Sequence, residues 1–116
     1  MNNSQFKIVE DDNKALHSEF HMHVIYKIKE GKRNEFIQKV MEAGIITASK
    51  QETGNLFYQY FFPIDDNNSV LLIEAWVDAN AQAAHCTTEN FKRLSEIKKD
   101  YVEKVIIKKY DASIII

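Results

Sequence analysis

The chain has 116 residues, a length that favours one domain with a single hydrophobic core. Hydrophobic residues make up 45% and charged residues 28%, and the formal net charge of -2 gives no overall attraction for nucleic acid or for an anionic membrane. The single Cys excludes an intrachain disulfide, and no apolar run approaches the roughly 20 residues that span a bilayer. We therefore expect a soluble cytoplasmic protein with neither a nucleic-acid nor a membrane partner.

Residues 1–19 differ in composition from the rest of the chain. They are rich in Asn, Ser and acidic residues, with neither the basic start nor the apolar core of a signal peptide. Their one apolar island, at 6–9, fits either a mobile polar leader or a short added edge strand. Both interpretations stay open, and we expect the folded domain at 20–116.

The first predicted elements are a strand and a helix. Residues 20–28 alternate with a period of two, which indicates a strand. After a turn at Gly31, apolar residues recur at steps of three and four and predict one amphipathic helix that ends near Glu52. Gly54 stands where a C-terminal cap needs a left-handed residue.

The second half of the chain continues this alternation of strands and helices. The pattern predicts strands at 56–62, 70–77 and 102–110, with a hairpin loop between the first two and two short helices before the third. Asp78 is suited to cap the first of these helices, and Thr87 or Thr88 the second.

The order of the elements favours a ferredoxin-like α+β fold, in which one four-stranded antiparallel sheet carries the helices on a single face. The strands at 56–62 and 70–77 carry apolar residues on both faces. Because helices cover only one face, the other would expose more than the few hundred Å² of apolar surface that monomers tolerate. We therefore expect a homodimer in which a second copy of the sheet covers this face.

Three segments resemble the antibiotic biosynthesis monooxygenase (ABM) family at the family's spacing. They are Glu52-Thr53-Gly54-Asn55-Leu56-Phe57-Tyr58, Ile73-Glu74-Ala75-Trp76-Val77-Asp78 and Ala84-His85-Cys86-Thr87-Thr88-Glu89-Asn90-Phe91. The resemblance covers about 22–110 and implies a dimeric α+β barrel with a pocket between sheet and helices. The family includes cofactor-free oxygenases of quinols and aromatic polyketides, haem-degrading enzymes and isomerases of a phosphorylated quorum signal.

Several side chains are expected to converge at one end of this fold. If the strand at 70–77 pairs antiparallel with that at 20–28, Glu74 and Trp76 lie near His21 and His23. The helix that begins at Asp78 would then fold back over this region and bring His85. We expect Trp, Glu and up to three His to meet there.

The predicted catalytic residues are His85 and Trp76. An imidazole titrates near neutral pH, so His85 is a candidate general acid or base; otherwise it is a partly buried helix histidine that bonds backbone. Trp76 offers a flat wall for an aromatic substrate, although buried aromatic residues more often simply pack in the core.

The predicted substrate-binding residues are His23, Glu74, Asn90 and Tyr58. His23 and Asn90 are candidate hydrogen-bond donors to a developing oxyanion. Glu74 either orients a histidine or is a solvated partner of a charged group. Tyr58 belongs to an alternating aromatic stripe that either lines the pocket or packs in the core or at the dimer interface.

Other polar residues are expected to have no chemical role. His21 and His23 have a spacing that a metal uses, but no third and fourth ligand is evident, so we expect no metal. Cys86 lies in no recognisable nucleophile motif and is expected to be inert. The Lys98-Lys99 pair is most simply part of a solvated helix face.

Two departures from the ABM pattern reduce the number of reactions expected for this chain. Many members carry a second His where this chain has Asn90. The haem-degrading branch needs an Asn, a Trp and a His where the nearest residues here are Val24, His85 and Ser95. These replacements speak against haem degradation.

The leading hypothesis is a cofactor-independent monooxygenase that oxidises a small quinol or phenolic compound with O2. No Gly-rich phosphate-binding turn follows a strand, so no flavin or nicotinamide is expected. The alternatives are an isomerase of a small carbonyl compound, which resembles the quorum-signal branch, and a non-catalytic module that binds a small ligand.

Overall fold

The computed structural model describes residues 5–10 and 18–115. The elements in chain order are β1 (Glu19–Ile28), α1 (Arg33–Glu42), α2 (Ile45–Lys50), β2 (Asn55–Phe61), β3 (Ser69–Trp76), α3 (Ala79–His85), α4 (Glu89–Tyr101) and β4 (Val102–Ala112). Residues 5–10 are exposed and belong to no helix or strand, and most of the rest of the expected leader lies outside the described residues.

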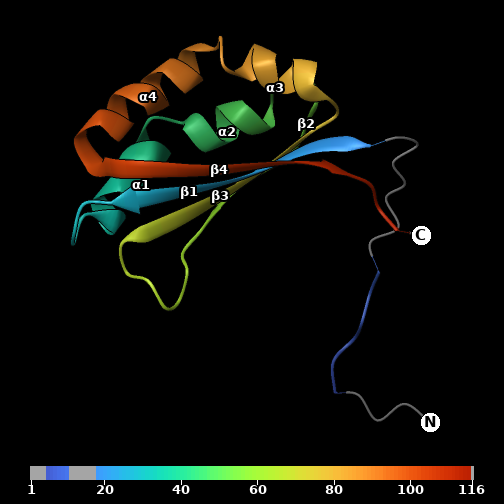
Figure 1. Cartoon of the computed structure of the whole chain (residues 1–116), viewed down its shortest axis with the longest axis horizontal. Coiled ribbons are helices and arrows are strands. Elements are labelled where there is room, and N and C mark those ends of the chain that lie inside the picture. The colour runs from blue at the N-terminus through green and yellow to red at the C-terminus, as the bar shows by residue number, and fades with distance from the viewer. Residues whose placement is uncertain (1–4, 11–17, 116) are drawn as a thin grey trace.

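The four strands form one antiparallel sheet in the order β2-β3-β1-β4. All four helices lie over the same face of this sheet (Figure 1). The predicted ferredoxin-like α+β fold is therefore confirmed, including the pairing of the strand at 70–77 beside the strand at 20–28.

Strand alternation determines which side chains face the helices. In β1, Met22, Val24, Tyr26 and Ile28 are at most 5% exposed. Glu74 of β3 pairs with Met22 on one side and with Tyr58 of β2 on the other, so the three side chains share the helix-covered face. The core continues into Phe36, Val40, Ile45, Leu72 and Leu94.

The single helix predicted up to Glu52 is wrong, because the structure has two helices there, α1 and α2. The break falls at Gly44, whose φ of 70° is left-handed and ends the helical path of the backbone. Both helices pack on the same face of the sheet, so apolar residues keep recurring at steps of three and four across the break. The sequence pattern therefore does not indicate where the first helix ends. Gly54 is also left-handed, with φ of 83°, but it lies in the turn into β2 rather than at a helix cap.

Two local caps fix the chain around α3 and α4. The Asp78 side chain accepts a hydrogen bond from the Ala81 backbone N–H at 2.8 Å, and Thr88 Oγ1 accepts from the Phe91 N–H at 3.2 Å. Thr88 also donates from Oγ1 to the His85 carbonyl oxygen at 2.7 Å. The predicted cap at Asp78 is confirmed, and Thr88 rather than Thr87 caps α4.

Within the described part of the chain, the second face of the sheet carries no helix (Figure 1). It presents the residues between those of the core, including Ile25, Leu71, Ile73, Phe57 and Phe61. Phe57 is 40% exposed, and the other four retain part of their surface. This surface, called here the open face, is the apolar patch that the sequence pattern predicts.

Candidate active site

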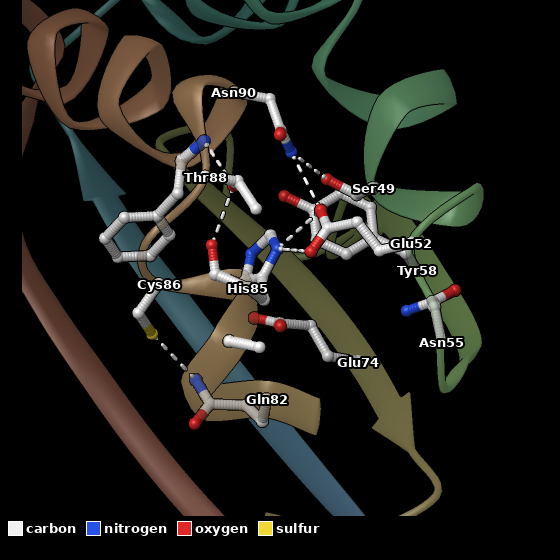
Figure 2. Close-up of polar contacts among 12 residues, drawn as sticks. Ser49, Glu52, Asn55, Tyr58, Glu74, Gln82, His85, Cys86, Thr88 and Asn90 are labelled. Atoms are coloured by element: carbon white, nitrogen blue, oxygen red, sulfur yellow. Dashed lines mark hydrogen bonds and ion pairs between the residues drawn. The ribbon is translucent and has the colours of Figure 1, made fainter. Parts of the chain in front are cut away.

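His85 ends α3 and lies in the interior between helices and sheet, with 2% of its surface exposed. Its Nδ1 is 2.8 Å from Glu52 Oε2 and 3.0 Å from Glu52 Oε1. Glu52 lies in the turn between α2 and β2, so a link across 33 positions of the sequence joins this turn to the end of α3 (Figure 2). The structure therefore holds His85 by a carboxylate, not by backbone.

The Glu52 carboxylate is itself fixed by neighbours. Asn90 Nδ2, from the first turn of α4, donates to Glu52 Oε2 and to Ser49 Oγ of α2, each at 3.0 Å. Asn90 is buried, and the Glu52 side chain is only 16% exposed. Buried carboxylates persist where donors of this kind replace water.

This arrangement decides the hydrogen position on the imidazole. An ionised carboxylate only accepts, so Nδ1 carries the hydrogen and neutral His85 presents a lone pair at Nε2. Among the described residues, no hydrogen bond involves His85 Nε2. Every fully buried side-chain nitrogen or oxygen in this part of the chain has a hydrogen-bond partner, so Nε2 is not fully buried. Nε2 therefore keeps contact with solvent and is the one position on His85 that can take a proton from a ligand.

Trp76 packs against His85 and is hydrogen-bonded to Glu74. The Trp76 and His85 rings lie 4.9 Å apart, and Trp76 Nε1 donates to Glu74 Oε1 at 3.1 Å. Trp76 has no exposed surface, so in this structure it supports His85 instead of presenting an open wall. Glu74 is 5% exposed and bonds Trp76, which corrects both expectations for it, an orienter of a histidine and a solvated partner.

Burial changes the pKa values of the carboxyl and phenol groups around His85. It raises the pKa of the Glu74 carboxyl, while the hydrogen bond from Trp76 and the positive charge that His85 carries when protonated oppose that shift. The pKa values of Tyr26, Tyr58 and Tyr60 are raised as well, chiefly by burial, so these phenols stay neutral. Tyr58 lies 5.8 Å from His85, ring to ring. The two hydroxyls of Tyr58 and Tyr60 share a hydrogen bond of 2.9 Å.

His21 and His23 do not join this site, so the expected meeting of three histidines is wrong. Both lie on the open face, because they alternate with the core residues of β1. His23 packs against Tyr110 of β4, with ring centroids 4.8 Å apart, and His21 Nε2 bonds Glu19 Oε1 at 2.9 Å. Asn90 is close to His85, but its amide is used to hold Glu52 and Ser49.

Lys98 of α4 is not the solvated side chain that the sequence suggested. Its Nζ lies 5.5 Å from the Tyr26 ring centroid and 5.6 Å from that of Phe91, and Phe91 lies 5.3 Å from the His85 ring. Burial lowers the Lys98 pKa, and the nearby Glu74 carboxyl opposes that change. Lys99, next in sequence, is exposed and pairs with Glu96.

Sequence reasoning missed Glu52 and Ser49 as site residues. Both belong to a predicted helix end, where polar residues usually meet water, and their partners come from α3 and α4. The only signal was the Glu-x-Gly turn at 52–54, part of the resemblance to the ABM family. Its Glu is the residue that holds His85.

Only 2% of the His85 surface is exposed, so little of its ring is open to solvent. Two surface pockets, of about 400 and 310 Å³, lie at the loops beside β1 and at the start of β2, and His85 lines neither. Because so little of the ring is open, a ligand at Nε2 would displace neighbours such as the half-buried Phe91, whose ring lies 5.3 Å from that of His85. Within 5–10 and 18–115, no three His, Cys, Asp or Glu side chains gather as a metal site would require, and no helix is long and apolar enough to cross a membrane.

Comparison with known proteins identifies the class. The family model for antibiotic biosynthesis monooxygenase matches residues 19–97, which include every element that builds the site. The chain therefore belongs to the ABM family.

Individual relatives agree in fold. The chain is 30% identical over 66 residues, 57% of its length and 67% of the relative's, to "Putative monooxygenase YcnE" of Bacillus subtilis (strain 168). Protein SO0527 from Shewanella oneidensis has a TM-score of 0.76 at 21% identity, over 85% of this chain and 95% of its own. PA3566 from Pseudomonas aeruginosa has a TM-score of 0.75 at 20% identity, over 84% and 97%.

Proposed function

We propose that the protein is a monooxygenase that oxidises a small quinol or phenol directly with O2 and needs no cofactor. The observation that carries the proposal is the Glu52–His85 pair, which leaves Nε2 as a proton acceptor inside an aromatic interior. Membership of the ABM family and similarity to a protein named as a monooxygenase support the reaction class. His85 is the proposed catalytic residue, and Glu52 positions it.

The chemistry begins with proton transfer. His85 Nε2 takes the hydroxyl proton of the substrate, and the resulting imidazolium is stabilised by the Glu52 carboxylate. The phenolate is electron-rich enough to reduce O2. The balance closes without another reductant: a quinol and O2 give a hydroxyquinone and water, with one oxygen atom entering the ring and the other leaving as water.

We also propose a homodimer in the cytoplasm. ABM proteins generally form homodimers and bind small molecules, and the open face supplies an apolar surface that a second copy would cover. The one cysteine, Cys86, is exposed and free, which suits a reducing compartment.

The first test is oxygen uptake by purified, dialysed and EDTA-treated protein with a panel of quinols and polyphenols. We expect uptake above the autoxidation blank, a loss of about 10²- to 10⁴-fold in His85→Ala, and a loss of about tenfold or more in Glu52→Gln. Glu96→Gln is the matched control, because Glu96 is an exposed glutamate that only pairs with Lys99 on α4. It should leave uptake unchanged.

Contrary outcomes point to the other classes. Loss of uptake on dialysis or EDTA treatment contradicts a cofactor-free reaction. Turnover of a small carbonyl compound with no oxygen consumed would identify the isomerase. Ligand binding with no reaction in any variant would leave a binding module.

A further inference from the structure

A phenolate formed at His85 needs a positive or hydrogen-bonding partner for its oxygen, because burying an unpaired anion is costly. The two donors that the sequence suggested are not available. Asn90 holds Glu52 and Ser49, and His23 lies on the other side of the sheet. The protein must supply this partner from another element.

Lys98 is a cation that shares a ring neighbour, Phe91, with His85. Its Nζ lies 5.6 Å from the Phe91 ring centroid and 5.5 Å from that of Tyr26, and the Phe91 ring lies 5.3 Å from the ring of His85, so Phe91 is a neighbour of both side chains. Within the described chain no carboxylate oxygen lies at ion-pair distance from Nζ. In the described part of the chain, the Lys98 ammonium therefore has two aromatic neighbours and no carboxylate at ion-pair distance.

We propose that Lys98 binds the anionic oxygen of the substrate and so selects phenols and enols that ionise in the site. This inference rests on the proposed function, since it assigns the oxygen from which His85 removes a proton. Lys98 is then a substrate-binding residue on α4, whereas His85 transfers the proton from α3.

The charges around Lys98 fit this assignment. Burial lowers its pKa because the ammonium has lost water, and an anion in contact with it would restore that lost stabilisation. The carboxyl that faces it, Glu74, has its own pKa raised by burial, which weakens its competition with the ligand. Glu74→Gln should therefore strengthen phenolate binding.

The test uses 4-nitrophenol, whose phenolate absorbs at longer wavelength than the neutral phenol. The absorbance of the probe is titrated with pH in the presence of excess protein. We expect the wild-type protein to lower the apparent pKa of the bound probe, equivalent to about tenfold or more in favour of the phenolate. Lys98→Met should abolish this shift, and Lys98→Arg should retain it.

Lys99→Met is the matched control, because it removes the neighbouring, exposed lysine of the same helix. It should leave the probe shift intact. A wild-type protein that does not lower the probe pKa, or a Lys98→Met variant that lowers it equally, overturns the inference.

This readout is independent of turnover. If oxygen uptake is absent in every variant while the Lys98-dependent shift persists, the proposed oxygenase fails and the anion site stands. If His85→Ala abolishes uptake while Lys98→Met changes neither uptake nor the probe shift, the oxygenase stands and the anion site fails.

Discussion

At the scale of single residues, the site depends on buried polar groups that hold one another. Glu52 accepts from His85 and Asn90, and Glu74 accepts from Trp76. The two carboxylates differ in surroundings. Glu52 has two nitrogen donors from other elements, whereas Glu74 has one donor from its own strand and a pKa raised by burial.

Replacing Glu74 by Gln should stabilise the protein at neutral and alkaline pH. Burial raises the Glu74 pKa, so the folded state favours the neutral carboxyl. The resulting stabilisation is fully present below the ordinary pKa of 4.5 and is lost as the pH rises through the higher folded-state value. Gln keeps an acceptor for Trp76 Nε1 without the charge. Thermal denaturation should give a higher Tm for Glu74→Gln than for wild type at pH 8, and a smaller difference at pH 4. An equal difference at both pH values would contradict this linkage.

Sequence reasoning identified part of the site and failed for a physical reason on the rest. His85, Trp76 and Glu74 could be predicted because the family pattern and the antiparallel pairing both bring them to one end of the sheet. His23 was wrong because nearness along a strand does not determine the face, which alternates residue by residue. Glu52 was missed because its partner lies on another element.

At the scale of elements, the loops that carry Glu52 and Asp78 are held close together by Gly54. Its carbonyl oxygen accepts a hydrogen bond from the Val77 backbone N–H at 2.8 Å. A Cβ at this position would lie 2.7 Å from Ala81 Cβ and 2.9 Å from Val77 Cγ2. The turn into β2 therefore requires both the conformation and the small size of glycine.

We expect Gly54→Ala to lower the free energy of unfolding by about 2–4 kcal/mol, from left-handed strain and the two close contacts together. Gly31→Ala is the matched control, because its φ of 75° is similar but a Cβ there meets nothing within 4 Å. It should cost about 1–2 kcal/mol, the strain alone. Urea denaturation measures both, and equal costs would show that the contacts near Gly54 relax.

The element boundaries also show what a sequence reveals. Caps at Asp78 and Thr88 could be predicted because a cap is made by residues within three positions of each other. The break at Gly44 could not, because the tertiary packing of α1 and α2 keeps one apolar period across it. The helix caps could therefore be predicted from the sequence, whereas the break between α1 and α2, which depends on tertiary packing, could not.

At the scale of the whole molecule, the open face is an apolar surface without a covering helix in the described chain. Ile73 lies in its central strand β3, between His23 of β1 and Gln59 of β2. The proposed dimer covers it with the same face of a second copy, so a charge there would be buried twice.

Sedimentation velocity should give a dimer for the wild-type protein and a monomer for Ile73→Asp. Met41→Asp is the control, because Met41 is a 52% exposed apolar residue of α1, on the helical layer. It should remain dimeric. Circular dichroism of both variants checks that they are folded, and a folded Ile73→Asp dimer would show that the open face is not the interface.

The long sequence separation between Glu52, His85 and Asn90 has a consequence for the order of refolding. Glu52 lies 33 positions before His85 and 38 positions before Asn90. Its contacts with them form only when the α2–β2 turn has docked against α3 and α4. Secondary structure can form before that docking, since helices and turns depend on local contacts. The hydrogen bonds of Glu52 with His85 and Asn90 therefore form only after these segments have docked, which makes them a reporter of tertiary structure.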